Sequence, residues 1–327
     1  MASYLPAESF PAFLEALAAY GELHGPRITE EGIVAFQPMH SPEDLLLDYR
    51  RTLLPPKKYL LPPYETILDW TALEGYRLPI FEKKIVLLGL HGCDLAGITY
   101  LDRIFLTAPP DPSYSARRAG ITLVGFSCEP DEYCFCGSSG LISTGNYSYD
   151  LFLHVDREGF FINSGSSKGK ELHDYASCLM ENREQPALPP CTVMEEDIIR
   201  EVTTRSETFP NSPLWEEFAA SCLSCGACSL CCPTCYCFDT REYGELDVGK
   251  SARLRDWDNC LFRSHGEIAG GHNFRPSRID RFRYRFQHKY LGFGPTRGIV
   301  SCVGCGRCRE VCPVRIDMLR LFKEERI

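Results

Sequence analysis

The sequence predicts an α/β N-terminal domain followed by a C-terminal, α-helical ferredoxin-type domain that holds two [4Fe–4S] clusters. Two observations lead to this fold class. Short apolar runs alternate with helical patterns over residues 1–207, whereas cysteines crowd into two similar groups over residues 208–327. Alternation of strands and helices is typical of a sheet that is covered by helices. A chain of 327 residues is also long enough for two domains.

The elements of the N-terminal domain follow from the spacing of its apolar residues. The segment that begins at Met1 is expected to form an amphipathic helix, and the proline-rich segment Leu54–Pro63 a surface loop. Strands are expected at Gly32–Met39, Ile85–Leu90, Ile121–Cys128 and Leu151–Val155, and helices at Asp94–Phe105 and 195–204.

The composition argues against several classes of protein. A net charge of −9 does not suit nucleic-acid binding, which needs a basic face. No apolar run reaches the roughly 18 residues of a membrane span, and the N-terminus lacks the basic region of a signal peptide. Eighteen cysteines without an export signal are expected to stay reduced and to bind metal. We therefore expect a cytoplasmic protein from an anaerobic setting, since exposed clusters oxidise readily.

A ferredoxin motif occurs twice in the C-terminal third. Residues 222–233 read CLSCGACSLCCP and residues 302–313 read CVGCGRCREVCP, and both fit C-x₂-C-x₂-C-x₃-C-P. In such motifs three cysteines wrap one cluster, and the fourth ligates the other cluster. Structural zinc is the alternative, but zinc sites usually contain two separated C-x₂-C pairs. The expected iron ligands are Cys222, Cys225, Cys228 and Cys312 for a first cluster, and Cys302, Cys305, Cys308 and Cys232 for a second.

The insert between the two motifs, residues 233–301, is expected to be largely helical. Apolar residues from Ile279 to Tyr290 recur at helical spacing. Basic residues recur on the same segment, and three roles remain open for them: a docking stripe, compensation of cluster charge, or a solvated helix face. His272, Arg275 and His288 could donate hydrogen bonds to cluster sulfurs or serve in packing. The basic residues are Arg278, Arg281, Arg285 and Lys289.

Four N-terminal cysteines form a candidate third site. Cys93 follows an expected strand and precedes a helix whose expected N-cap is Asp94, and Cys128 ends the next strand. Parallel strands would bring both to one edge of a sheet, close to the loop that carries Cys134 and Cys136. They could hold a third [4Fe–4S] cluster, although buried free cysteines are the alternative.

The remaining cysteines carry weaker signals. Cys235 and Cys237 follow the first motif closely and could be alternative ligands or neighbours of a cluster. Ordinary packing is expected for Cys178, Cys191, Cys231 and Cys260.

Two further motifs do not support a nucleotide site. The glycines of Ile85–Gly97 do not form G-x-G-x-x-G, and Gly165–Lys170 (GSSKGK) is one residue short of a P-loop. We expect the second segment to be a turn in a surface loop. We identify no acid–base pair or catalytic triad.

Several blocks resemble the iron–sulfur beta subunit of cytoplasmic sulfhydrogenases, and the chain is also similar to the iron–sulfur subunit of anaerobic sulfite reductase. The resemblance implies a subunit that relays electrons between a flavin- and NAD(P)-binding partner and a catalytic partner, a nickel–iron hydrogenase or a sirohaem protein. It also favours a third cluster at Cys93, Cys128, Cys134 and Cys136. The blocks are KKYLLPPYE (57–65), HGCDLAGITYLDRIF (91–105), CEPDEYCFCGSSG (128–140), CLSCGACSLCCPTCYCFD (222–239), WDNCLF (257–262), AGGHNFRPSR (269–278) and CVGCGRCREVCP (302–313).

Two functional hypotheses follow. In the first, the chain is an electron-transfer subunit without substrate chemistry of its own, and no flavin or nicotinamide motif is evident in it. In the second, it is a catalytic oxidoreductase component whose N-terminal domain itself binds flavin or substrate.

Overall fold

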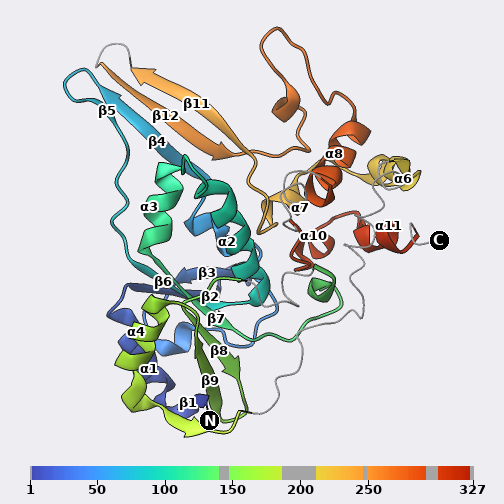
Figure 1. Cartoon of the computed structure of the whole chain (residues 1–327). Helices are drawn as coiled ribbons and strands as arrows, with labels where there is room; N and C mark the ends of the chain where they lie inside the picture. The colour runs from blue at the N-terminus through green and yellow to red at the C-terminus, as the bar shows by residue number, and fades with distance from the viewer. Residues whose placement is uncertain (1, 140–146, 186–210, 246–248, 292–300, 325–327) are drawn as a thin grey trace.

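A mixed, eight-stranded sheet lies at the centre of the N-terminal part of this computed structural model (Figure 1). Its strands are β1 (Ala2–Pro6), β2 (Glu22–Ile28), β3 (Val34–Pro38), β6 (Ile85–Leu90), β7 (Ile121–Phe126), β8 (Leu151–Val155), β9 (Gly159–Ser164) and β10 (Glu181–Arg183). They lie in the order β10-β1-β9-β8-β7-β6-β2-β3. The pairs β2–β6, β6–β7 and β7–β8 are parallel, and the outer pairs are antiparallel. The structure describes residues 2–139, 147–185, 211–245, 249–291 and 301–324.

Helices cover both faces of this sheet. They are α1 (Phe10–Ala18), α2 (Gly92–Phe105), α3 (Pro112–Gly120) and α4 (Ser167–Tyr175). Every residue of β6 and β7 is buried, as expected for parallel strands that are covered on two sides. Val86 and Leu88 belong to a core with α1 and α4, whereas Leu87 belongs to a core with α2 and α3. The N-terminal part is therefore α/β, as the sequence predicts.

Most of the N-terminal predictions are confirmed. The four expected strands correspond to β3, β6, β7 and β8, and the helix expected at Asp94–Phe105 lies within α2. A helix also forms near the N-terminus, although β1 precedes it. The prediction of a surface turn at Gly165–Lys170 is wrong, because the segment contains the start of α4, whose N-cap Ser166 accepts a hydrogen bond from the Gly169 amide. The helix expected at 195–204 lies outside the described residues.

The prediction of a surface loop at Leu54–Pro63 is also wrong. This segment contains a short 3₁₀ helix, η3 (Pro56–Tyr59), and Lys57, Leu60 and Leu61 are buried. Leu60 and Leu61 pack in the core that lies under α2. Prolines mark the chain as irregular, but they do not show whether an irregular segment lies on the surface.

A second, antiparallel sheet joins distant parts of the chain. Its strands are β4 (Tyr64–Thr71), β5 (Gly75–Arg77), β11 (Phe238–Glu245) and β12 (Lys250–Trp257), in the order β11-β12-β4-β5. Figure 1 shows this sheet as an arm that extends from the rest of the molecule. Arg255 of β12 forms a buried ion pair with Glu65 of β4 at 2.5 Å. The sheet therefore joins residues from both sides of the division expected between residues 207 and 208.

The helical prediction for the insert is wrong over β11 and β12 and correct over α8 (Arg278–Tyr290). The described residues of β11 are exposed on both faces, so this strand lacks the apolar–polar alternation by which strands are recognised. In α8 the apolar spacing is regular, and Phe282, Phe286 and Tyr290 are all buried.

The C-terminal part contains the helices α6 (Leu214–Ser221), α7 (Ala227–Leu230), α8, α10 (Arg307–Glu310) and α11 (Met318–Glu324). Helices α6, α8 and α11 share one apolar core. Trp215 of α6 is fully buried and lies near Phe282 and Phe286, with ring centroids 6.2 and 6.1 Å away. The described part of the chain contains no helix that is both long and apolar enough to cross a membrane.

Replacing Ser277 with alanine should destabilise the protein by about 1 kcal/mol, because the Ser277 hydroxyl caps α8. The Ser277 Oγ accepts a hydrogen bond of 3.1 Å from the Asp280 amide. Chemical unfolding followed by circular dichroism measures the change. Ser277→Thr keeps an acceptor at this position and should restore most of the loss; equal destabilisation by both variants would contradict the capping role.

Candidate iron–sulfur centres

The first ferredoxin loop (residues 222–233) and the second ferredoxin loop (residues 302–313) enclose two cavities. We call first cavity the one whose lining contains Cys222, Cys225, Cys228 and Cys312. It measures about 490 Å³ including its open mouth, and Leu261, Phe282 and Phe286 are among its apolar walls. Cys222, Cys225 and Cys228 come from the first loop, whereas Cys312 and a fifth lining residue, Cys308, come from the second loop.

The second cavity repeats this arrangement with the two loops exchanged. Its lining contains Cys302, Cys305 and Cys308 of the second loop together with Cys232 of the first loop, in a space of about 350 Å³. All eight motif cysteines therefore line these two cavities, and Cys308 lines both of them. Which four cysteines hold which cluster stays a prediction.

Both loops share one backbone conformation. Gly226 and Gly306 have a φ of 76° and precede the short helices α7 and α10. A side chain at Gly226 would strike Asn259, whose Nδ2 donates a hydrogen bond of 2.7 Å to the Gly226 carbonyl. A left-handed glycine is therefore needed where the chain turns around the sulfurs.

Backbone amides donate to two of the cysteine sulfurs. The Ser224 amide lies 3.3 Å from Cys222 Sγ, and the Ile316 amide lies 3.3 Å from Cys312 Sγ. Such hydrogen bonds favour the thiolate form that ligates iron.

The donor set suits [4Fe–4S] clusters. Within the described ranges, no group of three or more His, Cys, Asp or Glu side chains is placed to hold a single ion. In a cubane each cysteine binds a different iron, so four sulfurs spread around an apolar cavity fit this cofactor.

Buried cations line the second cavity. Arg285 and Lys289 of α8 are only 3% and 8% exposed, and both line it. Burial alone would lower the pKa of Lys289, but the nearby thiolates of Cys232 and Cys302 raise it above its usual value. Lys289 Nζ also donates to Thr234 Oγ1 at 2.6 Å. These side chains are placed to offset the negative charge of four thiolates and their cluster.

The basic residues of α8 therefore do not form a solvated stripe. Arg281, like Arg285 and Lys289, is buried, whereas Arg278 is exposed. Of the three roles left open by the sequence, compensation of cluster charge agrees with this burial. Two of the residues considered as hydrogen-bond donors to cluster sulfurs contact aromatic rings. His272 is exposed beside Phe274, and His288 stacks on Tyr284.

The N-terminal cysteines lie against the second ferredoxin loop. Cys93 lies in the first turn of α2, and Cys128 follows β7, the parallel neighbour of β6. The loop from Cys134 to Cys136 contacts the second loop directly, since the Phe135 amide donates to the Gly304 carbonyl at 2.8 Å. A side chain at Gly304 would strike the backbone of Cys136, which is itself buried.

Charge interactions relate these cysteines to one another. Burial raises the pKa of Cys93 well above its usual value, with further contributions from Asp94, Cys305 and Cys134. Burial also raises the pKa of Tyr49, and Cys93 and Cys128 contribute to this rise. Cys93 therefore interacts electrostatically with Cys134 and Cys305, and Cys136 packs against Gly304.

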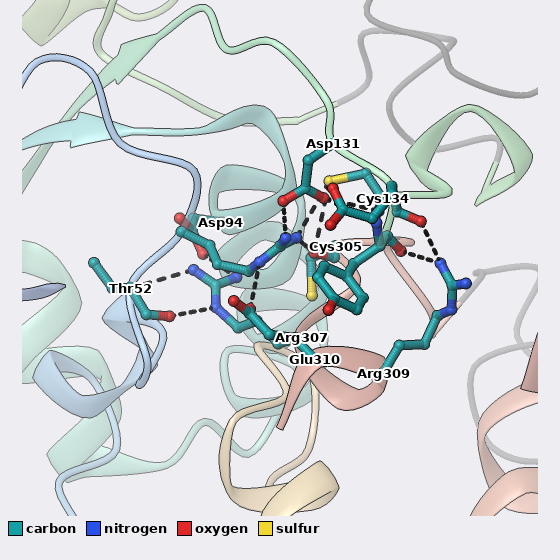
Figure 2. Close-up of polar contacts among 11 residues, drawn as sticks. Thr52, Asp94, Asp131, Cys134, Cys305, Arg307, Arg309 and Glu310 are labelled. Atoms are coloured by element: carbon teal, nitrogen blue, oxygen red, sulfur yellow. Dashed lines mark hydrogen bonds and ion pairs between the residues drawn. The ribbon is translucent and has the colours of Figure 1, made fainter. Parts of the chain in front are cut away.

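Two arginines join the N-terminal part to the second loop, and Figure 2 shows one of them, Arg307, beside Thr52. Arg307 forms a fully buried ion pair with Asp94 at 3.0 Å and donates to the Thr52 carbonyl at 2.9 Å. Arg51 donates to Cys134 Sγ at 3.4 Å and to the Cys305 carbonyl at 3.1 Å. Asp94 is thus not the N-cap that the sequence suggested: α2 begins at Gly92 after the N-cap His91, which leaves the Asp94 carboxylate free to pair with Arg307.

Lys57 is another residue that the sequence did not indicate. Its ammonium group is buried, donates to the Cys235 carbonyl at 2.8 Å and lies 4.5 Å from the centre of the Trp257 ring. Burial lowers the pKa of Lys57, although the thiolates of Cys235 and Cys232 oppose this change. A Lys-Lys pair between prolines carries no sign of such a contact, since it would suit an exposed loop equally well.

These loops and cavities place the chain in the class of [4Fe–4S] electron-transfer proteins. A family model described as a 4Fe-4S dicluster domain matches residues 221–316. The chain is also 36% identical, over 336 residues, to sulfhydrogenase 2 subunit beta of Pyrococcus furiosus, an alignment that covers 98% of this chain and 97% of that relative. The chain belongs to the family of sulfhydrogenase beta subunits and is an iron–sulfur subunit of a redox complex. No solved structure matches it.

Proposed function

We propose that this subunit relays electrons through two [4Fe–4S] clusters between a flavin- and NAD(P)-binding partner and a catalytic redox partner of the hydrogenase or sulfite-reductase kind. The proposal places this complex in the cytoplasm. The first cluster is assigned to Cys222, Cys225, Cys228 and Cys312, and the second to Cys302, Cys305, Cys308 and Cys232.

The observation that carries the proposal is that the two cysteine cavities are neighbours. Phe286 and Cys308 line both of them. Each ferredoxin loop also contributes a cysteine to the other loop's cavity, so the two clusters would be joined by short stretches of protein. Such proximity suits electron transfer, and it serves no evident purpose in a structural metal site.

The exposure of the residues around each cavity suggests the order in which electrons pass through the clusters. Around the first cavity Cys225 is exposed, and the neighbouring Leu223 and Val314 are 61% and 37% exposed. The second cavity is walled by buried residues and faces the N-terminal cysteines. We infer that one partner exchanges electrons at the first cluster, and the other at the opposite end of the relay.

Reduction of the isolated chain tests this function. After anaerobic reconstitution, the chain should contain no flavin, resist NAD(P)H, and be bleached by dithionite. NAD(P)H should bleach it only after a flavin-dependent reductase is added. Bound flavin, or direct reduction by NAD(P)H, would favour the alternative in which the N-terminal domain is itself catalytic.

We also propose a third [4Fe–4S] cluster at Cys93, Cys128, Cys134 and Cys136. Its support is the electrostatic interaction between Cys93 and Cys134 and the position of the Cys134–Cys136 loop directly on the second ferredoxin loop. Arg51, beside Cys134, would offset part of the cluster's charge.

Iron analysis tests the third cluster. The reconstituted chain should hold about twelve irons, and Cys93→Ser or the pair Cys134→Ser and Cys136→Ser should leave about eight, because one four-iron cluster is lost. Cys178→Ser is the matched control, since Cys178 is exposed and lies outside every cavity described above. An unchanged iron content in the Cys93 and Cys134/Cys136 variants would remove the third site.

A further inference from the structure

The two ferredoxin loops differ at the second residue after their last cysteine. Cys232 is followed by a proline and then by Thr234, whereas Cys312 is followed by a proline and then by Val314. Thr234 is only 2% exposed, and Val314 is 37% exposed. The repeat therefore places a buried hydroxyl beside the fourth cysteine of the first loop and an apolar side chain at the matching position of the second loop.

The Thr234 hydroxyl contacts three other groups. Its Oγ1 lies 3.4 Å from Cys232 Sγ, donates to the Ser301 carbonyl at 2.5 Å and accepts from Lys289 Nζ at 2.6 Å. Lys289 Nζ also donates to the Ser301 carbonyl at 3.2 Å. Because all four residues are buried, these contacts are shielded from solvent.

Helix α2 of the N-terminal part holds this group in place. The Ser301 Oγ donates a hydrogen bond of 3.1 Å to the hydroxyl of Tyr100, which is buried on α2. A side chain at Gly97, on the same helix, would strike Pro233, the residue before Thr234. The position of the Thr234 hydroxyl beside Cys232 is therefore fixed from both sides.

The hydroxyl proton has two acceptors within reach once Cys232 ligates iron. A cysteine ligand is a thiolate, which accepts hydrogen bonds and donates none. A threonine hydroxyl carries one proton and rotates about its C–O bond to suit its neighbours. Since Lys289 also donates to the Ser301 carbonyl, the Thr234 proton can turn toward Cys232 Sγ without leaving that carbonyl unpaired.

We propose that the Thr234 hydroxyl donates a hydrogen bond to the Cys232 thiolate in the iron-loaded chain and thereby makes the second cluster easier to reduce. Reduction adds negative charge, so a hydrogen bond to a ligand sulfur stabilises the reduced state more than the oxidised state. Val314 offers no such bond to Cys312, and Thr234 therefore sets the two clusters apart. The inference rests on the proposed function, because it takes Cys232 as a ligand of the second cluster.

Thr234→Val tests this role, because it removes the hydroxyl and keeps the branched shape of the side chain. At the midpoint potential of the second cluster in the unmodified chain, the ratio of reduced to oxidised cluster should fall about tenfold in the variant, which corresponds to 59 mV for one electron. Redox titration of the reconstituted chain, followed by electron paramagnetic resonance, measures the ratio. The second cluster is identified as the one that Cys305→Ala removes.

Two further variants serve as controls. Thr234→Ser retains a hydroxyl and should restore most of the original ratio. Thr122→Val makes the same replacement in β7, at a buried hydroxyl that has no hydrogen-bond partner among the residues that the structure describes, and it should change neither cluster. The first cluster should keep its potential in all of these variants.

The outcomes separate this inference from the proposed function. Full iron content with an unchanged potential of the second cluster in Thr234→Val would overturn the role of Thr234 and leave the relay intact. An equal shift of both clusters would overturn it as well, because the effect would not be local. If Thr234→Val loses iron, Thr234→Ala is compared with Thr234→Ser, since these two differ by the hydroxyl, and equal potentials there would also refute the inference. A chain that binds no clusters at all would contradict the relay instead.

Discussion

Replacing Cys312 with alanine should remove the cluster assigned to the first ferredoxin loop and spare the cluster assigned to the loop that contains Cys312. The second loop begins at Cys302, 80 positions after the first loop begins at Cys222. Cys312 belongs to the second loop but lines the first cavity beside three cysteines of the first loop. About four irons should be lost, because one iron of the cubane loses its protein ligand in a cavity that opens to solvent, and this weakens the whole cluster. Iron and sulfide analysis measures the loss.

A second variant on the same loop gives the matched comparison. Cys305 lines only the second of the two cavities, so Cys305→Ala should also remove about four irons, but from the other cluster. The surviving cluster can be identified by whether replacing Lys289 changes its reduction potential, because Lys289 lines only the second of the two cavities. After Cys312→Ala its potential should still depend on Lys289, and after Cys305→Ala it should not. Loss of the same cluster in both variants would contradict the cross-ligation.

That these eight cysteines line two neighbouring cavities could be predicted because their placement depends largely on local geometry. Three cysteines on one tight loop must face the same cavity, and the proline after the fourth fixes where that cysteine leaves the loop. The central strands were predictable for a related reason, since β6 and β7 are buried on both faces and therefore apolar throughout.

The contacts between the two parts of the chain could not be predicted in this way. Asp94 and Arg307 lie far apart in sequence, and each is an ordinary charged residue in its own segment until the fold buries them together. Lys57 is a similar case, because its burial depends on Trp257 and on the backbone carbonyls of Ser229 and Cys235. The arm formed by β11 and β12 was missed because an exposed strand carries no apolar alternation.

These unpredicted contacts hold the N-terminal part against the second ferredoxin loop. Gly304 and Gly306 leave room only for the backbone of residues 133–136, and Arg309 donates to the Glu132 and Tyr133 carbonyls at 2.9 and 2.7 Å. Figure 2 shows these contacts beside the Arg307–Asp94 pair. The second cavity is thus closed by the very loop that carries Cys134 and Cys136, which suits a relay that continues into the N-terminal part.

Replacing Lys289 with methionine should lower the reduction potential of the second cluster by on the order of 100 mV. Reduction adds a negative charge to the cluster, and a nearby buried cation stabilises that charge. A unit charge at roughly 6 Å in a medium of effective dielectric constant about 20 contributes about 3 kcal/mol, and about 1.4 kcal/mol corresponds to 59 mV for one electron. Redox titration followed by electron paramagnetic resonance measures the potential of each cluster.

Arg278→Met is the matched control for this prediction. Arg278 lies on the same helix but is exposed, so water and salt screen its charge and its removal should change the potential little. Lys289→Arg should retain most of the original potential, because it keeps the charge while changing the hydrogen bonds to Thr234 and Ser301. If the methionine and arginine variants at position 289 shifted the potential equally, those hydrogen bonds would be responsible and the charge would not.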